Sequence, residues 1–252
     1  MSLVAFQTAL GRSIRVSTAG VAFPGASDYL GSSDLSDDER TQLSALCASP
    51  GFEFTIAVQR SWCASRAAST ARRTLSVLSA EQREALLSAW VQRGGGTTSF
   101  VAGEAVSFLE FIASRLPDPS HALTLCRLEQ AVYRTGAYAE RFARPDLTDL
   151  GNPGLVLRLG KHAALVPFFV EPEQLLAALQ RMESPAALAK PLCHLLFAPG
   201  LPALCRRATR DEVELWRRLR TPLLVRALPD AHALRDVIGR LAEVGAIELI
   251  AD

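Results

Sequence analysis

Apolar residues recur at three- and four-residue spacing over much of the chain, most clearly between Glu104 and Phe142. The apolar positions are Val106, Phe108, Leu109, Phe111 and Ile112 in a first stretch and Leu125, Leu128, Val132 and Tyr133 in a second. This is the spacing of a buried helix face. We therefore expect two helices that fold against each other about a turn at Pro117–Pro119.

Three capping boxes mark further helix starts, because each has a Ser or Thr followed three residues later by Glu or Gln. They are Ser36 with Glu39, Ser79 with Gln82, and Thr209 with Glu212. Periodicity adds helices at Ser2–Ile14, Phe54–Leu78, Glu173–Met182, Pro185–Phe197 and Ala231–Val244, and Thr221–Pro222 predicts one more helix start. Most of the chain is thus predicted to be helical.

Strand signals appear only after residue 154. Leu155–Leu159 and Ala163–Phe169 are predicted to form two strands about a turn at Gly160, and Ala246–Ile250 a third strand after a helix stop at Gly245. Short helices, a longer helix, a glycine and a returning strand have the outline of a winged helix.

The fold class expected is mainly α, or α+β overall. Pro, Gly and acidic residues between Ala143 and Gly154 indicate a linker. We predict a helical domain at 1–144, a linker at 145–153 and a winged-helix-like domain with a short β-sheet at 154–252. Ser17–Asp38, with Phe23 and Tyr29, is predicted to be a loop, and Gly94–Gly96 a flexible connection.

Composition narrows the class of protein. Hydrophobic residues make up 49% and charged residues 21% of 252 residues, and the formal net charge of +1 gives no global basic excess for nucleic-acid binding. The five cysteines are odd in number and lack a C-x-x-C pair, which favours free thiols in a reducing compartment. No apolar run approaches membrane-spanning length. A cytoplasmic protein that binds neither nucleic acid nor membrane is expected.

Catalytic and metal-binding patterns are weak. His121, His162, His194 and His232 lie in different predicted elements, and Cys193-His194 with Cys205 offers at most three ligands. The acidic run Asp34–Glu39 is explained by a helix start. Arginines between residues 60 and 73 could bind phosphate, but a solvated or partner-facing helix surface is the simpler interpretation. We expect neither a catalytic residue nor a metal site.

Two uses of a winged helix remain open. Its last helix could read DNA, although Arg235, Asp236, Arg240 and Glu243 give that helix a face of mixed charge. Alternatively, a strand edge could accept an extended peptide through main-chain hydrogen bonds, and one of the three predicted strands, Leu155–Leu159, Ala163–Phe169 or Ala246–Ile250, must be that edge. The mixed charge favours the peptide.

Several segments carry a family resemblance. They are FQTAL near the start, FTIAVQRSWCASR from Phe54, LSAEQREALLSAW, FLEFIASRLP and RLEQAVYR. Together, over roughly Met1–Phe142, they resemble the small helical subunits that accompany iron-dependent TIM-barrel enzymes modifying ribosomal peptides, and within that group the MbnC-type subunits of methanobactin biosynthesis. The rest of the chain is similar in outline to peptide-recognition winged helices.

The resemblance implies a non-catalytic subunit of a heterodimer. An MbnB-like TIM-barrel partner would hold the iron and use dioxygen to convert cysteines of an MbnA-like precursor peptide into oxazolone and thioamide groups. The present chain, with no cofactor of its own, would bind the leader segment of that peptide.

Residues for both contacts follow as expectations. Leader binding is expected at Leu155, Val156, Leu157, Arg158, Leu159, Leu165, Val166, Phe168 and Phe169. The partner interface is expected at Arg60, Trp62, Arg66, Arg127, Glu129 and Tyr133.

Overall fold

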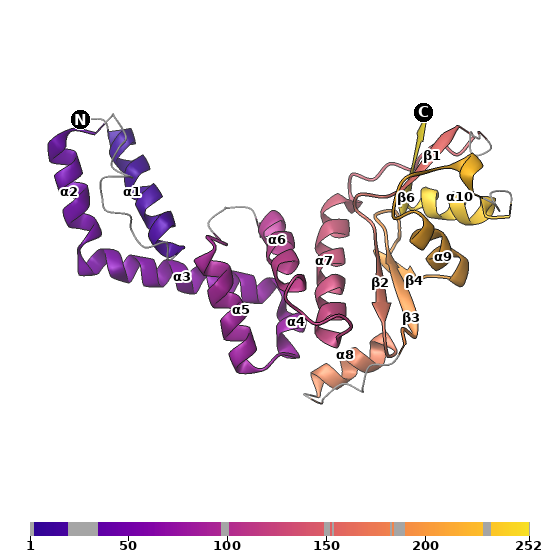
Figure 1. Ribbon diagram of the computed structural model, residues 1–252, viewed down its shortest axis with the longest axis horizontal. Helices are drawn as coiled ribbons and strands as arrows, with labels where there is room; N and C mark the ends of the chain where they lie inside the picture. Colours follow the sequence, from indigo (N-terminus) through magenta and orange to yellow (C-terminus); the bar gives the residue numbers. More distant parts are fainter. Residues whose placement is uncertain are drawn as a thin grey trace. The chain divides into compact units, whose positions relative to one another are not determined.

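The structure is a computed structural model that describes residues 3–19, 35–96, 101–148, 152, 154–181, 183, 190–228 and 233–251. The chain divides into two units, Met1–Phe111 and Ile112–Asp252. The described residues form ten α-helices and two three-stranded antiparallel sheets (Figure 1). The mainly α class predicted from the sequence is confirmed. The linker expected at 145–153 lies inside the second unit, and residues 149–151 and 153 of it are outside the described residues.

The first unit is helical throughout its described part. Its elements are α1 (Leu3–Thr18), α2 (Asp37–Cys47), α3 (Pro50–Thr70), α4 (Arg72–Ser76), α5 (Ala80–Gln92) and most of α6 (Val101–Ala113). α1 runs further than Ile14, and most of the loop expected after it, including Phe23 and Tyr29, lies outside the described residues.

Side-chain caps fix where these helices begin. Ser36 and Ser79 each accept a hydrogen bond from the backbone N–H three residues on, and the side chains of Glu39 and Gln82 accept one from the cap backbone in return. Both predicted capping boxes are therefore present, and the third, at Thr209, is present in the second unit. Each satisfies backbone donors that a helix start leaves unpaired.

Two groups of buried side chains illustrate the core of the first unit. Ala9, Leu35 and Leu43 form a small buried cluster at α1 and α2. Trp90 of α5 packs against Phe108 and Phe111 of α6, with ring centroids 5.3 Å apart in both pairs. These contacts bury the aromatic positions of the first predicted apolar stretch.

The second unit opens with the end of α6 and with α7 (His121–Ala139), which lie on either side of the predicted proline turn. The buried face of α7 includes Leu125, Cys126 and Ala131. Val132 was expected on that face, but its side chain is 42% exposed. Leu125 is buried as expected, but in the later turns the buried face passes through Ala131 and Thr135, whose small side chains carry little weight in an apolar pattern.

Two sheets follow. One has the order β5–β1–β6, from β1 (Leu155–Leu159), β5 (Leu223–Leu224) and β6 (Ile247–Ala251). The other has the order β2–β3–β4, from β2 (Ala164–Phe168), β3 (Cys193–Phe197) and β4 (Cys205–Arg207). The helices are α8 (Pro172–Gln180), α9 (Arg210–Arg218) and α10 (Arg235–Glu243), with a 3₁₀ turn at Val225–Ala227.

Three expectations for this unit were wrong. Cys193–Phe197 is a strand and not the end of a helix, and residues 184–189 before it lie outside the described residues. Thr221–Pro222 leads into strand β5 and not into an α-helix. The strands on either side of Gly160 do not pair with each other, since β1 pairs with β6 and β2 pairs with β3. In each case tertiary pairing overrides a local signal.

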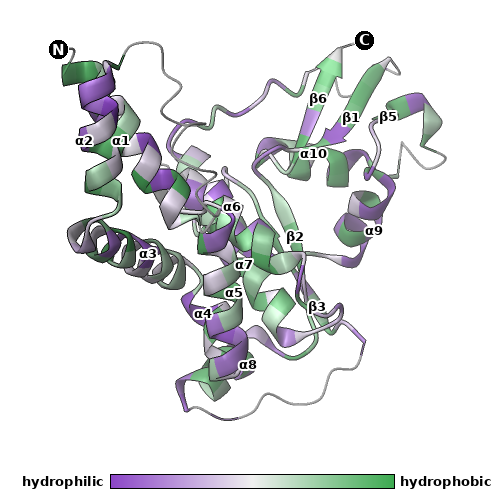
Figure 2. Cartoon of the chain, turned by 60° about the vertical axis from the view of Figure 1, so that its left-hand side comes forward, coloured by the Kyte–Doolittle hydropathy of each residue, from purple (hydrophilic) through white to green (hydrophobic). Residues whose placement is uncertain are grey.

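Hydrophobic residues concentrate on β1, β6 and the helix α10 that packs beside them (Figure 2). Leu157, Leu215 and Leu241 are fully buried in this core. Gly160 lets the ends of β1 and β6 approach closely, because a Cβ at this position would lie 2.3 Å from the carbonyl oxygen of Gly245. Gly245 has φ +72°, a backbone conformation that favours glycine.

Candidate docking surfaces

Helix α3 has one buried face and one exposed apolar face. Phe52, Ile56, Cys63 and Ala67 are buried within the first unit. On the opposite side, Phe54, Val58 and Trp62 follow one another at four-residue spacing with side chains 71%, 38% and 65% exposed. We call these three residues the α3 stripe.

The α3 stripe has the chemistry of a protein-binding surface. Isolated exposed apolar residues are common on proteins, but a contiguous row with two large aromatic side chains is not. Phe and Trp are the kinds of residue that supply most of the binding energy at interfaces. The stripe is therefore the strongest docking candidate among the described residues.

Two of the arginines expected at the partner interface instead serve the first unit. Arg60 donates to the carbonyl oxygens of Thr18 (3.0 Å) and Ser17 (2.8 Å), which tie it to the end of α1. Arg66 donates to the carbonyl of Gly96 (2.8 Å) and to the buried carboxylate of Glu104 (2.5 Å). Both guanidinium groups hold segments of the fold, although Arg60, like Trp62, stays exposed, whereas Arg66 is half-buried.

The expected interface residues of α7 differ in exposure. Arg127 forms an exposed ion pair with Asp118 at 3.1 Å. Glu129 is 5% exposed and Tyr133 is half-buried. Arg127 and Tyr133 can touch a partner, whereas Glu129 belongs to the interior.

The strand expected to accept a peptide lies in the middle of its sheet. β6 pairs with β1 from Leu155 to Leu159, and β5 covers Val156 and Leu157 on the other side. Leu155 and Leu157 are buried, Val156 and Leu159 are half-buried, and Arg158 reaches solvent, where it pairs with Glu248 at 2.5 Å. β1 therefore has strand partners on both sides at Val156 and Leu157 and offers no continuous open edge to a peptide.

β6 is an edge strand with free main-chain groups. Gly160 donates to the carbonyl of Ala246 (2.9 Å), so in the alternating antiparallel ladder the next hydrogen-bonded pair is Arg158 with Glu248. The N–H and C=O groups of Ile247 and Leu249 then point away from β1. Within the described part of the chain, no strand pairs with this side of β6.

β2 is also an edge strand, but Pro167 stands within it and provides no N–H donor. Val166 and Phe168 are each 1% exposed, Leu165 is half-buried against the core, and Phe169 lies just after the strand. Its side chains thus serve packing, and its main chain is a poorer acceptor than that of β6.

A cavity of about 240 Å³ adjoins the open edge of β6. Ile247, Glu248 and Leu249 line it together with Tyr138 and His162, whose rings stack at 4.2 Å and 13°. The arrangement offers apolar and aromatic contacts directly beside the outward main-chain groups.

Glu248 supplies a fixed negative charge at this cavity. Burial raises the pKa of its carboxyl, but hydrogen bonds from the Lys161 N–H and the Arg158 side chain outweigh that and lower it. The carboxylate is consequently ionised at neutral pH.

Metal-ligating residues are not clustered in the described part of the chain. Cys205 pairs with Phe197 on β3, at the opposite end of that strand from Cys193, so the two thiols considered with His194 are kept apart. Burial lowers the pKa of His194, and Arg217 lowers it further. No helix among the described residues has the length and apolar content needed to cross a bilayer.

Sequence reasoning missed Phe54, Val58 and Tyr138 as candidate contacts, and it considered Leu249 only as part of the candidate edge strand Ala246–Ile250, outside the expected leader-binding residues. Phe54 and Val58 could have been found with Trp62, because their four-residue spacing defines a second apolar face of α3. Tyr138 and Leu249 are distant in sequence, and only the fold places them around one cavity. Comparison of the chain with protein-family models and with curated proteins finds no match.

Proposed function

We propose that this chain is a non-catalytic docking subunit of a heterodimer, which binds an MbnB-like TIM-barrel iron enzyme and presents an MbnA-like precursor peptide to it. The observation that carries the docking role is the exposed α3 stripe. The choice of partner rests on the sequence resemblance of the first 142 residues. In this role the iron and its oxygen chemistry, on cysteines that become oxazolone and thioamide groups, belong to the partner.

The docking role predicts that Phe54→Ser with Trp62→Ser abolishes co-purification with the barrel enzyme. Both side chains are largely exposed, so the double variant should keep the unfolding free energy of the parent within about 0.5 kcal/mol. Leu192→Ser, at a side chain 59% exposed in the second unit, is the matched control and should co-purify normally. Normal complex formation by the folded double variant would exclude the stripe as the interface.

The peptide role is assigned to the open edge of β6. A leader segment in extended conformation would pair with the outward groups of Ile247 and Leu249 and place a side chain in the adjoining cavity. Binding there would raise the local concentration of the core cysteine at the partner's iron.

Strand addition predicts different results for two substitutions at Leu249. Leu249→Pro removes an outward N–H, whereas Leu249→Ala shortens the same side chain and keeps the donor. We expect Leu249→Pro to weaken leader binding roughly tenfold beyond Leu249→Ala in fluorescence anisotropy. Equal affinities of the two variants, each shown to be folded by circular dichroism, would rule out main-chain pairing at this position.

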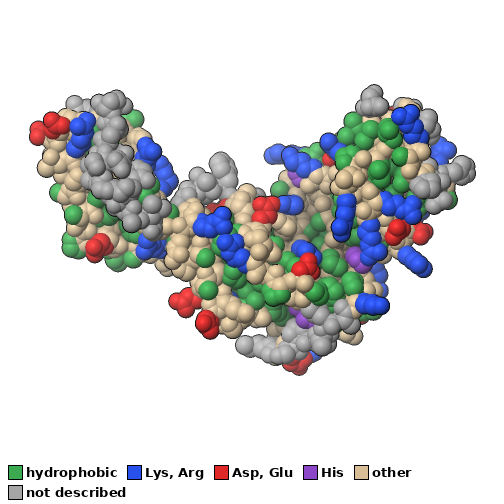
Figure 3. Space-filling model, viewed as in Figure 1, with side chains coloured by type: hydrophobic (Ala, Val, Ile, Leu, Met, Phe, Trp, Pro, Cys, Tyr) green, Lys and Arg blue, Asp and Glu red, His purple; other side chains and the backbone are tan. Residues whose placement is uncertain are grey.

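One observation favours a second candidate, a winged-helix nucleic-acid binder. Lys and Arg side chains gather on the second unit (Figure 3). In the sequence of this unit, seven arginines fall between residues 206 and 226, namely Arg206, Arg207, Arg210, Arg217, Arg218, Arg220 and Arg226. However, Arg206, Arg207 and Arg218 pair with Glu212, Glu171 and Glu214. A nucleic-acid binder would show affinity for a DNA duplex that falls steeply with salt concentration.

A further inference from the structure

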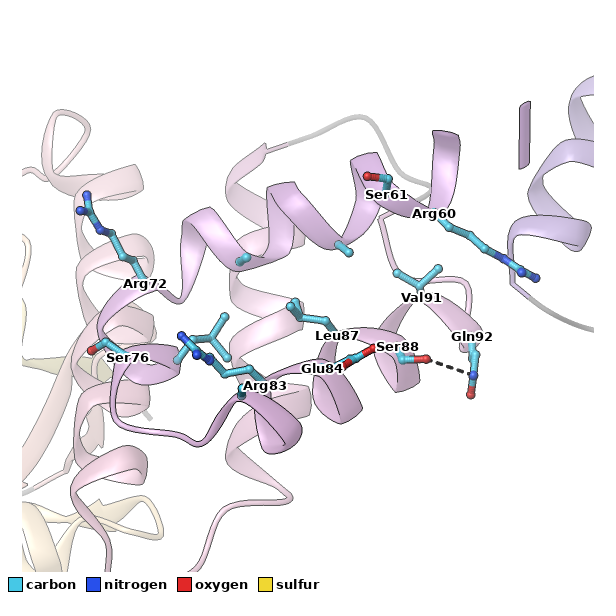
Figure 4. A pocket seen from close by; sticks show the side chains of 14 residues that line it. Arg60, Ser61, Arg72, Ser76, Arg83, Glu84, Leu87, Ser88, Val91 and Gln92 are labelled. Atoms are coloured by element: carbon cyan, nitrogen blue, oxygen red, sulfur yellow. Dashed lines mark hydrogen bonds between the residues drawn. The ribbon is translucent and has the colours of Figure 1, made fainter. Parts of the chain in front are cut away.

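A second surface of the first unit lies between α3 and α5. It is an open groove of about 980 Å³, and Figure 4 shows the residues that line it. Its floor consists of Ala64 and Ala68 on α3, Leu75 on α4, and Leu87 and Val91 on α5. None of these five belongs to the α3 stripe.

The shape of the groove fits a helix. α5 lines it from Ala80 to Gln92, which is about 20 Å of helix axis or between three and four turns. The alanines on α3 are four residues apart, and such small side chains let an inserted helix come close. Small-molecule sites are more enclosed and bury most of their ligand. The open groove therefore suits an amphipathic helix better.

The charges on the rim are unequally distributed. Arg72, Ser76 and Arg83 lie toward one end, and Arg60, Val91 and Gln92 toward the other (Figure 4). Arg60 is committed to the α1 carbonyls, as described above. Arg72 and Arg83 are exposed, and among the described residues neither has an ion-pair partner.

Glu84 is the acidic residue of the lining and stands beside the middle of the groove (Figure 4). A complementary helix would therefore carry acidic residues at the end that meets Arg72 and Arg83, and a basic residue near its centre. Apolar residues at three- and four-residue spacing would face Ala64, Ala68 and Leu87.

We propose that the α3–α5 groove binds an amphipathic helix of a partner protein that is acidic at the end next to Arg72 and Arg83. The site goes beyond the proposed docking and leader-binding roles and does not depend on them, because it uses neither the α3 stripe nor the edge of β6. Charge pairs at the rim select the orientation of the helix, and the apolar floor supplies most of the affinity.

The test uses the full chain and a synthetic helical peptide with a leucine face, glutamates at one end and a central lysine. Its binding is followed by fluorescence anisotropy. We expect Arg72→Glu with Arg83→Glu to weaken binding roughly tenfold or more. A second peptide, in which lysines replace the terminal glutamates, should bind the Arg72→Glu, Arg83→Glu variant more tightly than it binds the parent chain. Arg220→Glu with Arg226→Glu, an equal change of charge in the second unit, should leave affinity unchanged.

Ala68→Trp is a second test variant, because its large side chain fills the floor of the groove without changing the charge. It should abolish binding of the peptide. Retained binding by this variant, or equal affinity for the acidic and basic peptides, would overturn the proposal. So would binding of a fluorescent fatty acid, but not of the peptide, in the same groove. Phe54→Ser with Trp62→Ser should still bind the peptide, so a failure of the proposed docking role is distinguishable from a failure here.

Discussion

At the residue scale, Glu212 shows how one buried carboxylate joins two elements. Its side chain is 2% exposed and accepts hydrogen bonds from both terminal nitrogens of Arg206 at 2.7 Å. It also accepts from the backbone N–H of Thr209 at 2.8 Å, which completes the capping box of α9. The same carboxylate therefore starts α9 and fixes β4 through Arg206. The sequence predicted the cap, but not the arginine.

We predict that Glu212→Gln lowers the unfolding free energy at neutral pH by about 2 kcal/mol. Removing one charge of a fully buried ion pair costs more than this, about 3 to 5 kcal/mol. Here the Arg206 side chain is 34% exposed, so water can hydrate its guanidinium group when the carboxylate is lost. Urea unfolding measures the change. Glu81→Gln, at an exposed position in the first turn of α5, is the control and should change stability by less than about 0.5 kcal/mol.

The pH dependence of stability gives a separate check on Glu212. Burial raises the pKa of this carboxyl, but the hydrogen bonds from Arg206 and Thr209 outweigh it, so the folded-state pKa lies below its ordinary value of 4.5. The unfolded state therefore binds a proton at Glu212 more readily than the folded state does. The stability that the ionised Glu212 contributes is fully present above pH 4.5 and is lost as the pH falls through the folded-state pKa. The Gln variant should lose less stability over this range. Superimposable acid profiles of variant and parent would contradict the assignment.

At the element scale, the sequence predicted helices well because their signals are local. The three capping boxes and the apolar periods depend on residues three or four positions apart. Sheet pairing depends on residues far apart, as for Leu157 and Leu249, so the turn at Gly160 could be placed but not the partners of its strands. The run Cys193–Phe197 has only five residues, too few for its period to distinguish a strand from a helix.

The candidate sites follow the same division between local and distant signals. The α3 stripe could be predicted in principle, although an exposed apolar face and a buried one have the same period. The edge of β6 could not, because the order of strands decides which of them is central. The peptide acceptor is thus assigned to β6 and not to β1 because of how the strands pair. β1 and β6 are neighbours although about 90 residues separate them in the sequence.

The junction of β1 and β6 yields a prediction for Gly160. A Cβ at this position would lie 2.3 Å from the Gly245 carbonyl oxygen and 3.1 Å from that of Ala246. Because both obstacles are backbone atoms, Gly160→Ala should cost about 2 kcal/mol or more of unfolding free energy. Gly11→Ala is the control in helix α1, where a Cβ meets nothing within 4 Å, and it should stabilise the chain by about 0.5 to 1 kcal/mol. Equal stability of the two variants in urea would contradict this packing.

At the scale of the whole molecule, the cysteines report on both units. All five are free, with Cys63, Cys126 and Cys193 buried and Cys47 and Cys205 half-buried. Burial raises the pKa of Cys47, Cys63, Cys193 and Cys205. The thiolate is the reactive form of cysteine. In both units, folding therefore lowers the reactivity of these thiols, because it limits the access of reagents to them and lowers the fraction that is ionised at neutral pH.

We therefore predict slow thiol labelling of the native chain at neutral pH and rapid labelling of five thiols in denaturant, without added reductant. Cys47 and Cys63 belong to the first unit and Cys126, Cys193 and Cys205 to the second, so peptide mass spectrometry across a urea series separates the two. Within each unit the cysteines should become reactive at the same urea concentration, because a cooperative core exposes its buried side chains together. Rapid native labelling of Cys126 or Cys193, or separate midpoints for cysteines of one unit, would show that the unit does not unfold as one body.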